Sequence, residues 1–466
     1  MDWKTSAGAL VIGAICLAAQ AQSLSPEQKR FHGIYKELVE TNTSHSAGDT
    51  TLAAQRMARH LRDAGFAEAD LQILEPFPRK GNLVARFSGD GSKKPLLLLA
   101  HLDVVEALRA DWKTDPFVLQ ESDGFFTARG SIDDKSMAAA FVSILSQLKR
   151  EGFRPKRDIK RDIILALTAD EERGDVPSNG VYWLVNNKRE LLEAEFGINE
   201  GGGGELHEGK PFLQRMQVAE KMYTTYQFTV RNPGGHSSLP VPENAIYELA
   251  AALTRVGAHR FPVKLAEVTR FYFERSAKLS SGQLAQDMRA VASGHVDAQA
   301  YDRLSSSALY NALLRTTCVA TMVRAGHAEN ALPQSATATV NCRILPHDDA
   351  AAVDAEVRRL AGPKVEVKET NAPLASPPSP LRADLMKLVE GLTQEMFPGV
   401  PVVPSMSTGA TDSRFLRNLG MPMYGVSGLF VDPADNRIHG LDERIEIARL
   451  YAGREFMYEM VKRLAQ

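Results

Sequence analysis

The feature that most constrains the fold is a short, uninterrupted apolar run, Pro95–Ala100, which ends abruptly in His101-Leu102-Asp103. Such a run is typical of a strand buried on both faces of a parallel sheet. Ligands bind outside the carboxyl ends of strands in open α/β sheets, so His101 and Asp103 are predicted to lie at a functional edge. Asp103, two residues on, points the same way as His101 and can fix its tautomer for metal binding. Taken alone, this short motif also fits a histidine that merely ends a strand.

The same pattern recurs twice along the chain. The apolar stretch Asp162–Thr168 precedes Asp170-Glu171-Glu172, and Phe196–Asn199 precedes Glu200 and a run of glycines. A helix is predicted at Asp134–Leu148 from its apolar spacing. Further elements are predicted upstream, namely helices Ser25–Glu40 and Gly48–Ala64 and strands Leu71–Leu74 and Asn82–Phe87. This alternation predicts an α/β fold with a doubly wound, mostly parallel sheet.

The pattern changes from Tyr223 onward. Strands and helices are predicted in the order strand, helix, strand, strand, helix, strand, at Tyr223–Val230, Glu243–Val256, Thr316–Arg324, Thr337–Ile344, Ala350–Leu360 and Lys364–Lys368. This order is typical of a small α+β sandwich. The segment Phe261–Leu314 within it is expected to be helical or irregular. α/β character then returns, with helix Leu381–Met396, loop Ser405–Arg414, strand Met423–Val426 and helix Ile445–Leu464. We therefore expect a main α/β domain at 22–222 and 373–466, with an inserted α+β domain at 223–372.

The first residues have the three parts of a signal peptide. Lys4 precedes the apolar stretch Ala7–Ala19, which is too short to span a bilayer, and Ala19-Gln20-Ala21 fits a cleavage site. Residues 1–21 are therefore predicted to be removed, leaving an exported protein, periplasmic or secreted, without a membrane span. The mature chain keeps Cys318 and Cys342, which export allows to pair but does not force to pair.

Composition adds one exclusion. With a net charge of −2, the chain has no basic field of the kind that binds nucleic acid.

Residues that can bind metal gather at the predicted strand ends, and His439 is added from a downstream segment. They are His101, Asp103, Asp133, Glu171, Glu172, Glu200 and His439. Two histidines with several carboxylates predict a site for two divalent ions, with zinc the expected metal and one carboxylate bridging the ions. Of the adjacent pair Glu171-Glu172, one can bind metal while the other takes a proton from water. Any one of these acids alone also fits a solvated surface charge.

Several segments resemble the dizinc metallopeptidase family that includes carboxypeptidase G, acetylornithine deacetylase, succinyl-diaminopimelate desuccinylase, aminoacylase and carnosinase. The matching segments are His101–Val105, Arg129–Lys135, Thr168–Glu172, Asn199–Gly202, Gly234–Ser238 and Ile438–Arg444. They occur in the family's order and cover nearly the whole mature chain. Departures from the family's usual residues at Glu106, Ala128 and Ser136 affect no ligand position.

The resemblance implies a role for each residue of the cluster. His101 and Glu200 would hold one zinc, and Glu172 and His439 the other, with Asp133 bridging. Asp103 would orient His101, and Glu171 would act as the general base. The resemblance also implies a cis peptide between Asp133 and Asp134.

Substrate-binding residues are implied as well. The resemblance makes the larger domain catalytic and the inserted domain a lid, whose His236 would reach the site from the partner subunit of a homodimer formed through the lid. Asn330, Arg343, Gly409 and Thr411 would hold the substrate's carboxylate. Arg343 has the forked donors for that task, but an arginine in a strand also fits a surface ion pair.

These inferences converge on a zinc hydrolase that cleaves the amide bond of small peptides or N-acyl amino acids. Glutamate at position 200, where relatives of the aminopeptidase type tend to have aspartate, favours a carboxypeptidase or deacylase. Three alternatives stay open: a dipeptidase of the same family, a non-catalytic peptide-binding protein, and a protein with one structural zinc.

Overall fold

The computed structural model describes residues 24–153, 157–174, 176–294 and 298–466. The predicted signal peptide, residues 1–21, lies outside these ranges. Within them, no helix combines the length and the apolar character needed to cross a membrane.

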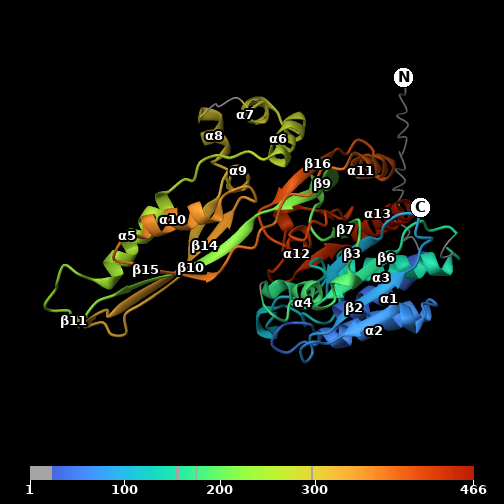
Figure 1. Ribbon diagram of the computed structural model, residues 1–466, viewed down its shortest axis with the longest axis horizontal. Helices are drawn as coiled ribbons and strands as arrows, with labels where there is room; N and C mark the ends of the chain where they lie inside the picture. The colour runs from blue at the N-terminus through green and yellow to red at the C-terminus, as the bar shows by residue number, and fades with distance from the viewer. Residues whose placement is uncertain (1–23, 154–156, 175, 295–297) are drawn as a thin grey trace, which may run out of the picture.

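A ten-stranded sheet forms the centre of the larger part of the molecule (Figure 1). Its strands are β1 (Leu71–Leu74), β2 (Asn82–Phe87), β3 (Leu96–His101), β6 (Ile163–Thr168), β7 (Phe196–Asn199), β8 (Gly203–His207), β9 (Lys210–Glu220), β16 (Val402–Ser407), β17 (Met423–Gly425) and β18 (Phe430–Val431). Their order is β1-β2-β6-β3-β7-β17-β9-β8-β18, with β16 also paired to β9. The central strands β6, β3, β7 and β17 are parallel, so the predicted α/β fold is confirmed.

Helices cover both faces of this sheet. One face packs against α1 (Pro26–Val39), α2 (Thr50–Asp63), α3 (Lys135–Arg150), α11 (Ala383–Met396) and α13 (Ile447–Ala465), and the other against α4 (Gly180–Asn187) and α12 (Ser413–Arg417). Successive side chains of β3 enter opposite cores: Leu98 contributes to the first and Leu99 to the second. Burial on both faces explains why this strand has no polar alternation.

A four-stranded antiparallel sheet forms the smaller part. Its order is β12 (Thr317–Ala325), β14 (Ser335–Ile344), β10 (Met222–Arg231) and β15 (Glu366–Asn371), and it packs against α5 (Ala245–Ala258) and α10 (Ala350–Ala361). The elements follow one another in the predicted order. A two-stranded ribbon, β11 (Gly235–His236) with β13 (Ala331–Leu332), lies at the end farthest from the ten-stranded sheet (Figure 1). The boundaries 22–222, 223–372 and 373–466 stay a prediction.

The segment between α5 and β12 is helical, as expected, but it packs away from the four-stranded sheet. It contains α6 (Glu267–Leu279), α7 (Gly282–Ala292), α8 (Ala298–Leu304) and α9 (Ala308–Leu314). Phe273 and Leu314 belong to the same core as Val403 of β16. The backbone therefore returns to the larger part before it completes the smaller one. At the junction, the buried Lys221 donates a hydrogen bond of 2.7 Å to the carbonyl of Arg315.

The predicted loop at Ser405–Arg414 is too long. β16 continues to Ser407, and α12 begins at Ser413. β16 pairs with β9 on one side only, and such an edge strand tolerates Pro404. The strands β4 (Gln120–Ser122), β5 (Phe125–Thr127) and β19 (Arg444–Glu446) were not predicted, because three residues are too few to show a period.

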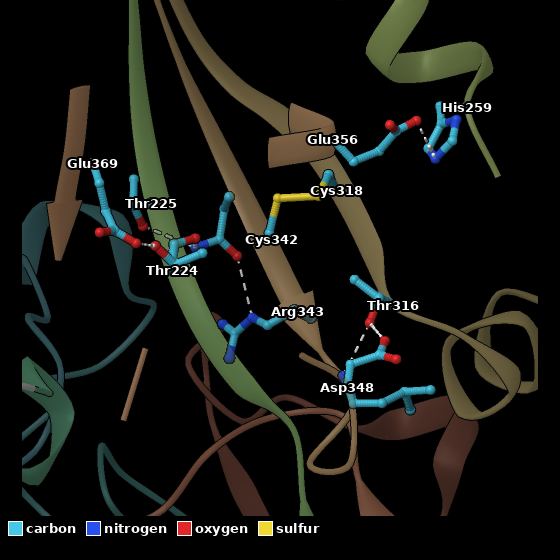
Figure 2. The surroundings of a disulfide bond; sticks show 12 residues. Thr224, Thr225, His259, Thr316, Cys318, Cys342, Arg343, Asp348, Glu356 and Glu369 are labelled. Atoms are coloured by element: carbon cyan, nitrogen blue, oxygen red, sulfur yellow. Dashed lines mark hydrogen bonds and ion pairs between the residues drawn. A yellow bond between two sulfur atoms is a disulfide. The ribbon is translucent and has the colours of Figure 1, made fainter. Parts of the chain in front are cut away.

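The sequence left the pairing of Cys318 and Cys342 open, and the structure joins them in a disulfide (Figure 2). They lie directly opposite each other on β12 and β14, with Cα atoms 4.0 Å apart. The bond therefore links an edge strand of the four-stranded sheet to its neighbour.

We expect the double variant Cys318→Ala/Cys342→Ala to lose about 3 kcal/mol of unfolding free energy, because the bond closes a loop in the unfolded chain. Denaturant titration of the variant and of the wild type measures the difference. Reductant should destabilise the wild type in the same way and leave the variant unchanged. Equal stability of the two proteins without reductant would contradict the expectation.

Candidate functional site

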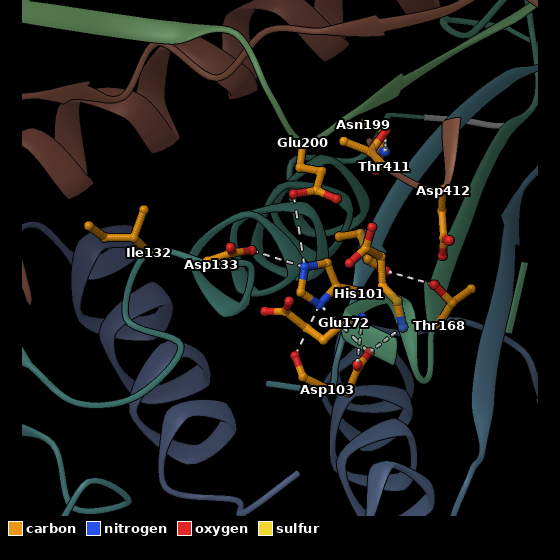
Figure 3. A network of polar contacts seen from close by, with 12 residues as sticks. His101, Asp103, Ile132, Asp133, Thr168, Glu172, Asn199, Glu200, Thr411 and Asp412 are labelled. Atoms are coloured by element: carbon orange, nitrogen blue, oxygen red, sulfur yellow. Dashed lines mark hydrogen bonds and ion pairs between the residues drawn. The ribbon is translucent and has the colours of Figure 1, made fainter. Parts of the chain in front are cut away.

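Three neighbouring parallel strands deliver the predicted cluster to one edge of the sheet (Figure 3). His101 is the last residue of β3 and is paired in register with Thr168, the last residue of β6. Glu171 and Glu172 form a short turn just after β6, and Glu200 directly follows β7. Parallel strands end on the same side of a sheet, which explains why residues far apart in sequence meet here.

Asp133 and His439 reach this edge on loops that a strand pair holds together. β19, which follows His439, pairs with β5, which precedes Asp133. The two oxygens of the Asp133 carboxylate then face different histidines: Oδ1 lies 3.0 Å from Nε2 of His101, and Oδ2 lies 3.2 Å from Nε2 of His439. Glu200 lies 3.9 Å from the same nitrogen of His101, and Glu172 lies 2.9 Å from that of His439.

These residues form two groups. Within each group, the ligand atoms lie within 4.8 Å of one another. One group is His101, Asp133 and Glu200, and the other is Asp133, Glu172 and His439. Asp133 belongs to both. The structure thus brings together all of the predicted ligands in two overlapping sets.

Asp103 contacts His101 mainly through its backbone. Nδ1 of His101 lies 3.0 Å from the Asp103 carbonyl oxygen and 3.7 Å from its carboxylate. An N–H donated from Nδ1 leaves the lone pair of Nε2 for a metal. The carboxylate itself accepts hydrogen bonds from the backbone N–H groups of Glu171 and Glu172, at 3.0 and 3.1 Å. Asp103 therefore positions the glutamate turn as well as the histidine.

Carboxylates are crowded into a largely buried space at this edge. Burial, followed by the nearby Asp412, raises the pKa of Glu171 well above its usual range. Burial, followed by Glu171, does the same to the pKa of Glu200. Like charges in a desolvated space repel, so this cluster needs cations to stay ionised. Histidine nitrogens with carboxylate oxygens are a donor set that suits zinc.

Glu443 holds the loop that carries Asp133, and no role was predicted for it. Its buried carboxylate pairs with Arg129 at 2.7 Å and accepts from the backbone N–H groups of Gly130, Ile132 and Asp133 at 3.1, 2.8 and 3.3 Å. Glu443 lies in the segment that also contains His439, but its spacing there does not reveal this contact.

The peptide that follows the clamped loop, between Asp133 and Asp134, is cis, which confirms that prediction.

Of the predicted substrate-binding residues, Arg343 contacts Tyr223, whose hydroxyl lies next to Gly174 at the end of the glutamate turn. Its guanidinium stacks 5.2 Å from the ring centre of Tyr223, and Arg414 stacks on the same ring at 5.3 Å. A side chain at Gly174, just past Glu172, would meet the Tyr223 hydroxyl. Two cations thus gather on the side of the site where Glu171 lies.

The loop with Gly409 and Thr411 is fixed from within. The N–H of Gly409 donates to the hydroxyl of Ser407 at 3.0 Å. The N–H and the hydroxyl of Thr411 donate to the buried carboxylate of Glu220, at 3.1 and 2.9 Å. The Thr411 hydroxyl is therefore already engaged within the protein.

His236 and Asn330 meet at the far ribbon and not at the cluster. The N–H of Ser237 donates to the carbonyl of Asn330 at 3.0 Å, and the His236 side chain is exposed. The ribbon projects away from the ten-stranded sheet (Figure 1). Within one chain, these two residues lie apart from the metal-binding groups.

Comparison with known proteins identifies the family. The sequence model of peptidase family M20/M25/M40 matches residues 97–463, the span that carries every residue of both ligand groups. The chain belongs to this family. As an M20 family member, it is a metal-dependent hydrolase.

Similar M20 proteins include the human N-fatty-acyl-amino acid synthase/hydrolase PM20D1, which is 29% identical over 391 residues, covering 80% of this chain and 74% of that protein. The probable carboxypeptidase S-like 2 of Dictyostelium discoideum is 30% identical over 395 residues, covering 82% and 74%.

Solved structures share the M20 fold. A metallo-carboxypeptidase from Sulfolobus solfataricus aligns with a TM-score of 0.71 at 18% identity, covering 94% of this chain and 99% of that chain. Human carnosine dipeptidase 1 aligns with a TM-score of 0.63 at 17% identity, covering 94% and 97%.

We expect Glu443→Gln to weaken metal binding about 10- to 100-fold, the usual effect of removing a group that orients a ligand. The amide cannot accept all of the hydrogen bonds that reach the carboxylate, so the Asp133 loop should loosen. Metal titration by calorimetry measures the change. Glu446→Gln, in the same segment but half-buried, serves as the control and should bind like the wild type; equal affinities for both variants would contradict the assignment.

Proposed function

We propose that this chain is a zinc-dependent hydrolase that cleaves the amide bond of small peptides or N-acyl amino acids, of the carboxypeptidase or deacylase type. The observation that carries the proposal is the Asp133 carboxylate, whose two oxygens face the histidines of two overlapping ligand groups. The names of similar proteins, an N-fatty-acyl-amino acid synthase/hydrolase and a carboxypeptidase S-like protein, support this substrate class.

Each ligand group would hold one zinc ion, so that the chain binds two. His101 and Glu200 would complete one site, Glu172 and His439 the other, and Asp133 would bridge. The bound ions would supply an activated water molecule and polarise the carbonyl of the scissile amide. The unbalanced negative charge of the cluster supports the presence of such cations.

Glu171 is the proposed general base. It lies among the ligands but belongs to neither group, and burial raises its pKa well above the usual range. It takes a proton from the attacking water and later gives a proton to the leaving amine. Asp103 keeps the backbone of Glu171 in place through its carboxylate. Arg343, with Arg414 beside it, would hold the carboxylate of the amine product, as forked guanidinium donors do.

We further propose that the enzyme works as a homodimer through the smaller part, because His236 cannot reach the site of its own chain. The edge strand β12 exposes Val319, Met322 and Val323, and α5 exposes Tyr247. Exposed apolar groups beside an unpaired strand edge are suited to a second copy of the chain. In such a dimer, His236 and Asn330 of one subunit would complete the site of the other.

The disulfide supports the proposed export, because disulfides persist in the periplasm and outside the cell. The predicted signal peptide, in a different part of the chain, also supports export.

We expect Glu171→Gln to lower kcat by about 10²- to 10⁴-fold on every substrate while zinc stays bound at two ions per chain. The panel compares N-acyl amino acids, a dipeptide and longer peptides, and elemental analysis counts the metal. Glu190→Gln, an exposed glutamate on the same domain, is the control. Undiminished turnover would remove Glu171 from its role, and one zinc per chain would favour a structural site. A wild type that turned over the dipeptide alone would be a dipeptidase.

We expect two inactive variants, His236→Ala and Glu171→Gln, to restore activity when they are co-expressed. Mixed dimers would then combine an intact Glu171 with the partner's intact His236, and about a quarter of all sites would be active. Turnover of the purified mixture measures this, with each variant alone as the control. Activity of the mixture no higher than that of the single variants would contradict a shared site.

A further inference from the structure

A cavity of about 210 Å³ opens beside the ligand cluster and has no role in the proposed mechanism. Asp133 and Glu200 border it, and the glycine run that follows Glu200 forms part of its lining. Its remaining walls are mostly apolar, with Leu429 and Ile438 among them. An apolar cavity that begins at metal ligands is a place for part of a substrate.

Two helices supply the deeper walls. α3 contributes Ser136, Met137 and Ala140, and α13 contributes Leu450, Gly453, Arg454 and Met457. Both sets have helical spacing, so each helix turns one face to the cavity. Ala140 is small, and a larger side chain at this position would enter the space. Gly453 allows α13 to approach Leu429, which a Cβ at this position would meet at 3.1 Å.

Two arginines, Arg215 and Arg454, line the cavity, and both are engaged by other side chains. Arg215 pairs with Glu205 at 2.6 Å. The buried Arg454 turns to α3, where it donates to Ser143 at 3.1 Å and to Gln147. Ser143 and Gln147 lie one and two helical turns beyond Ala140, away from Asp133. The guanidinium is thus engaged at the inner part of the helix pair.

The position of the cavity distinguishes the two halves of an amide substrate. The leaving amine must lie near Glu171, which protonates it, and its carboxylate needs cations. Arg343 and Arg414 gather near Tyr223, which abuts Gly174 just past the glutamate turn. The cavity borders Asp133 and Glu200, and neither Arg343 nor Arg414 lines it. The arginines that do line it, Arg215 and Arg454, are engaged by Glu205 and by Ser143. The acyl half of the substrate therefore faces the cavity.

We infer that the cavity between α3 and α13 binds the apolar acyl chain of an N-acyl amino acid. The protein would then hydrolyse the amide bond of N-acyl amino acids whose acyl chains are of medium length. This inference rests on the proposed function and names its substrate class. A cavity of 150 Å³ accommodates benzene, and a water-sized group takes about 30 Å³, so this one has room for about seven methylene-sized groups. An octanoyl chain fits that space.

The test is a series of N-acyl derivatives of one amino acid, from acetyl to palmitoyl. For the wild type, kcat/KM should rise about three- to four-fold per methylene until the cavity is full, near octanoyl, and then level off. Ala140→Phe should lower the octanoyl-to-acetyl ratio of kcat/KM by about ten-fold or more, the effect of excluding two methylenes. Met457→Ala enlarges the cavity, so kcat/KM should level off at a longer acyl chain than in the wild type.

Ala448→Phe is the matched control, because it adds the same ring on the exposed side of α13. This variant should keep the wild-type octanoyl-to-acetyl ratio of kcat/KM. Thermal melting checks that each variant folds, and Ala140→Leu replaces the phenylalanine variant if that one does not. Two results would overturn the inference. One is an octanoyl-to-acetyl ratio of kcat/KM near one for the wild type. The other is that, in a second series of N-acetyl amino acids, Ala140→Phe changes only the preference for the amino-acid side chain.

Octanoate binding, measured by calorimetry, separates this inference from the proposed function because it needs no turnover. The wild type and Ala448→Phe should bind octanoate, and Ala140→Phe should not. Binding without hydrolysis of any amide would retain the cavity assignment and refute the hydrolase. Absence of octanoate binding by the wild type would refute the cavity assignment even if amides are hydrolysed.

Discussion

The accumulation of negative charge at one edge of the sheet is the constraint on which the site depends. Three parallel strands end in acidic or histidine-containing turns, and two loops add Asp133 and His439. Burial raises the pKa of Glu171 and of Glu200, so the carboxylates compete for whatever positive charge is available. Two histidines cannot balance them. Bound cations offset the repulsion among the carboxylates, so the cluster has a high affinity for metal. The geometry that is unfavourable without cations therefore suits a metal-dependent hydrolase.

Much of this could be predicted from sequence because local patterns carried it. The unbroken apolar run of β3 follows from burial on both faces, and the residues after β3, β6 and β7 meet because parallel strands end together. The structure accordingly brings the predicted ligands together. Arg343 is placed beside the site only by the folding of a separate sheet, and the spacing of residues along its strand could not show that.

The features that escaped prediction depend on contacts between distant segments. Glu443 clamps the Asp133 loop across more than three hundred residues, through backbone N–H groups that leave no mark in a sequence. No strand was predicted at β16, because its strand character depends on its pairing with β9. The helices α6–α9 have ordinary amphipathic patterns that do not tell which core they join, so their packing on β16 is a tertiary result.

The return of α6–α9 to the larger part has a mechanical consequence. The backbone passes between the two parts at Lys221, before α6, at Arg315 and after β15, and these connections are hydrogen-bonded to one another. Lys221 donates to the carbonyl of Arg315, Lys264 to that of Leu314, and Thr224 to that of Asn371. A joint built from mutually tied connections resists torsion, since twisting would break these bonds at once, but allows the connections to flex together. Any displacement of the far ribbon relative to the ten-stranded sheet would therefore have to move all of these connections together.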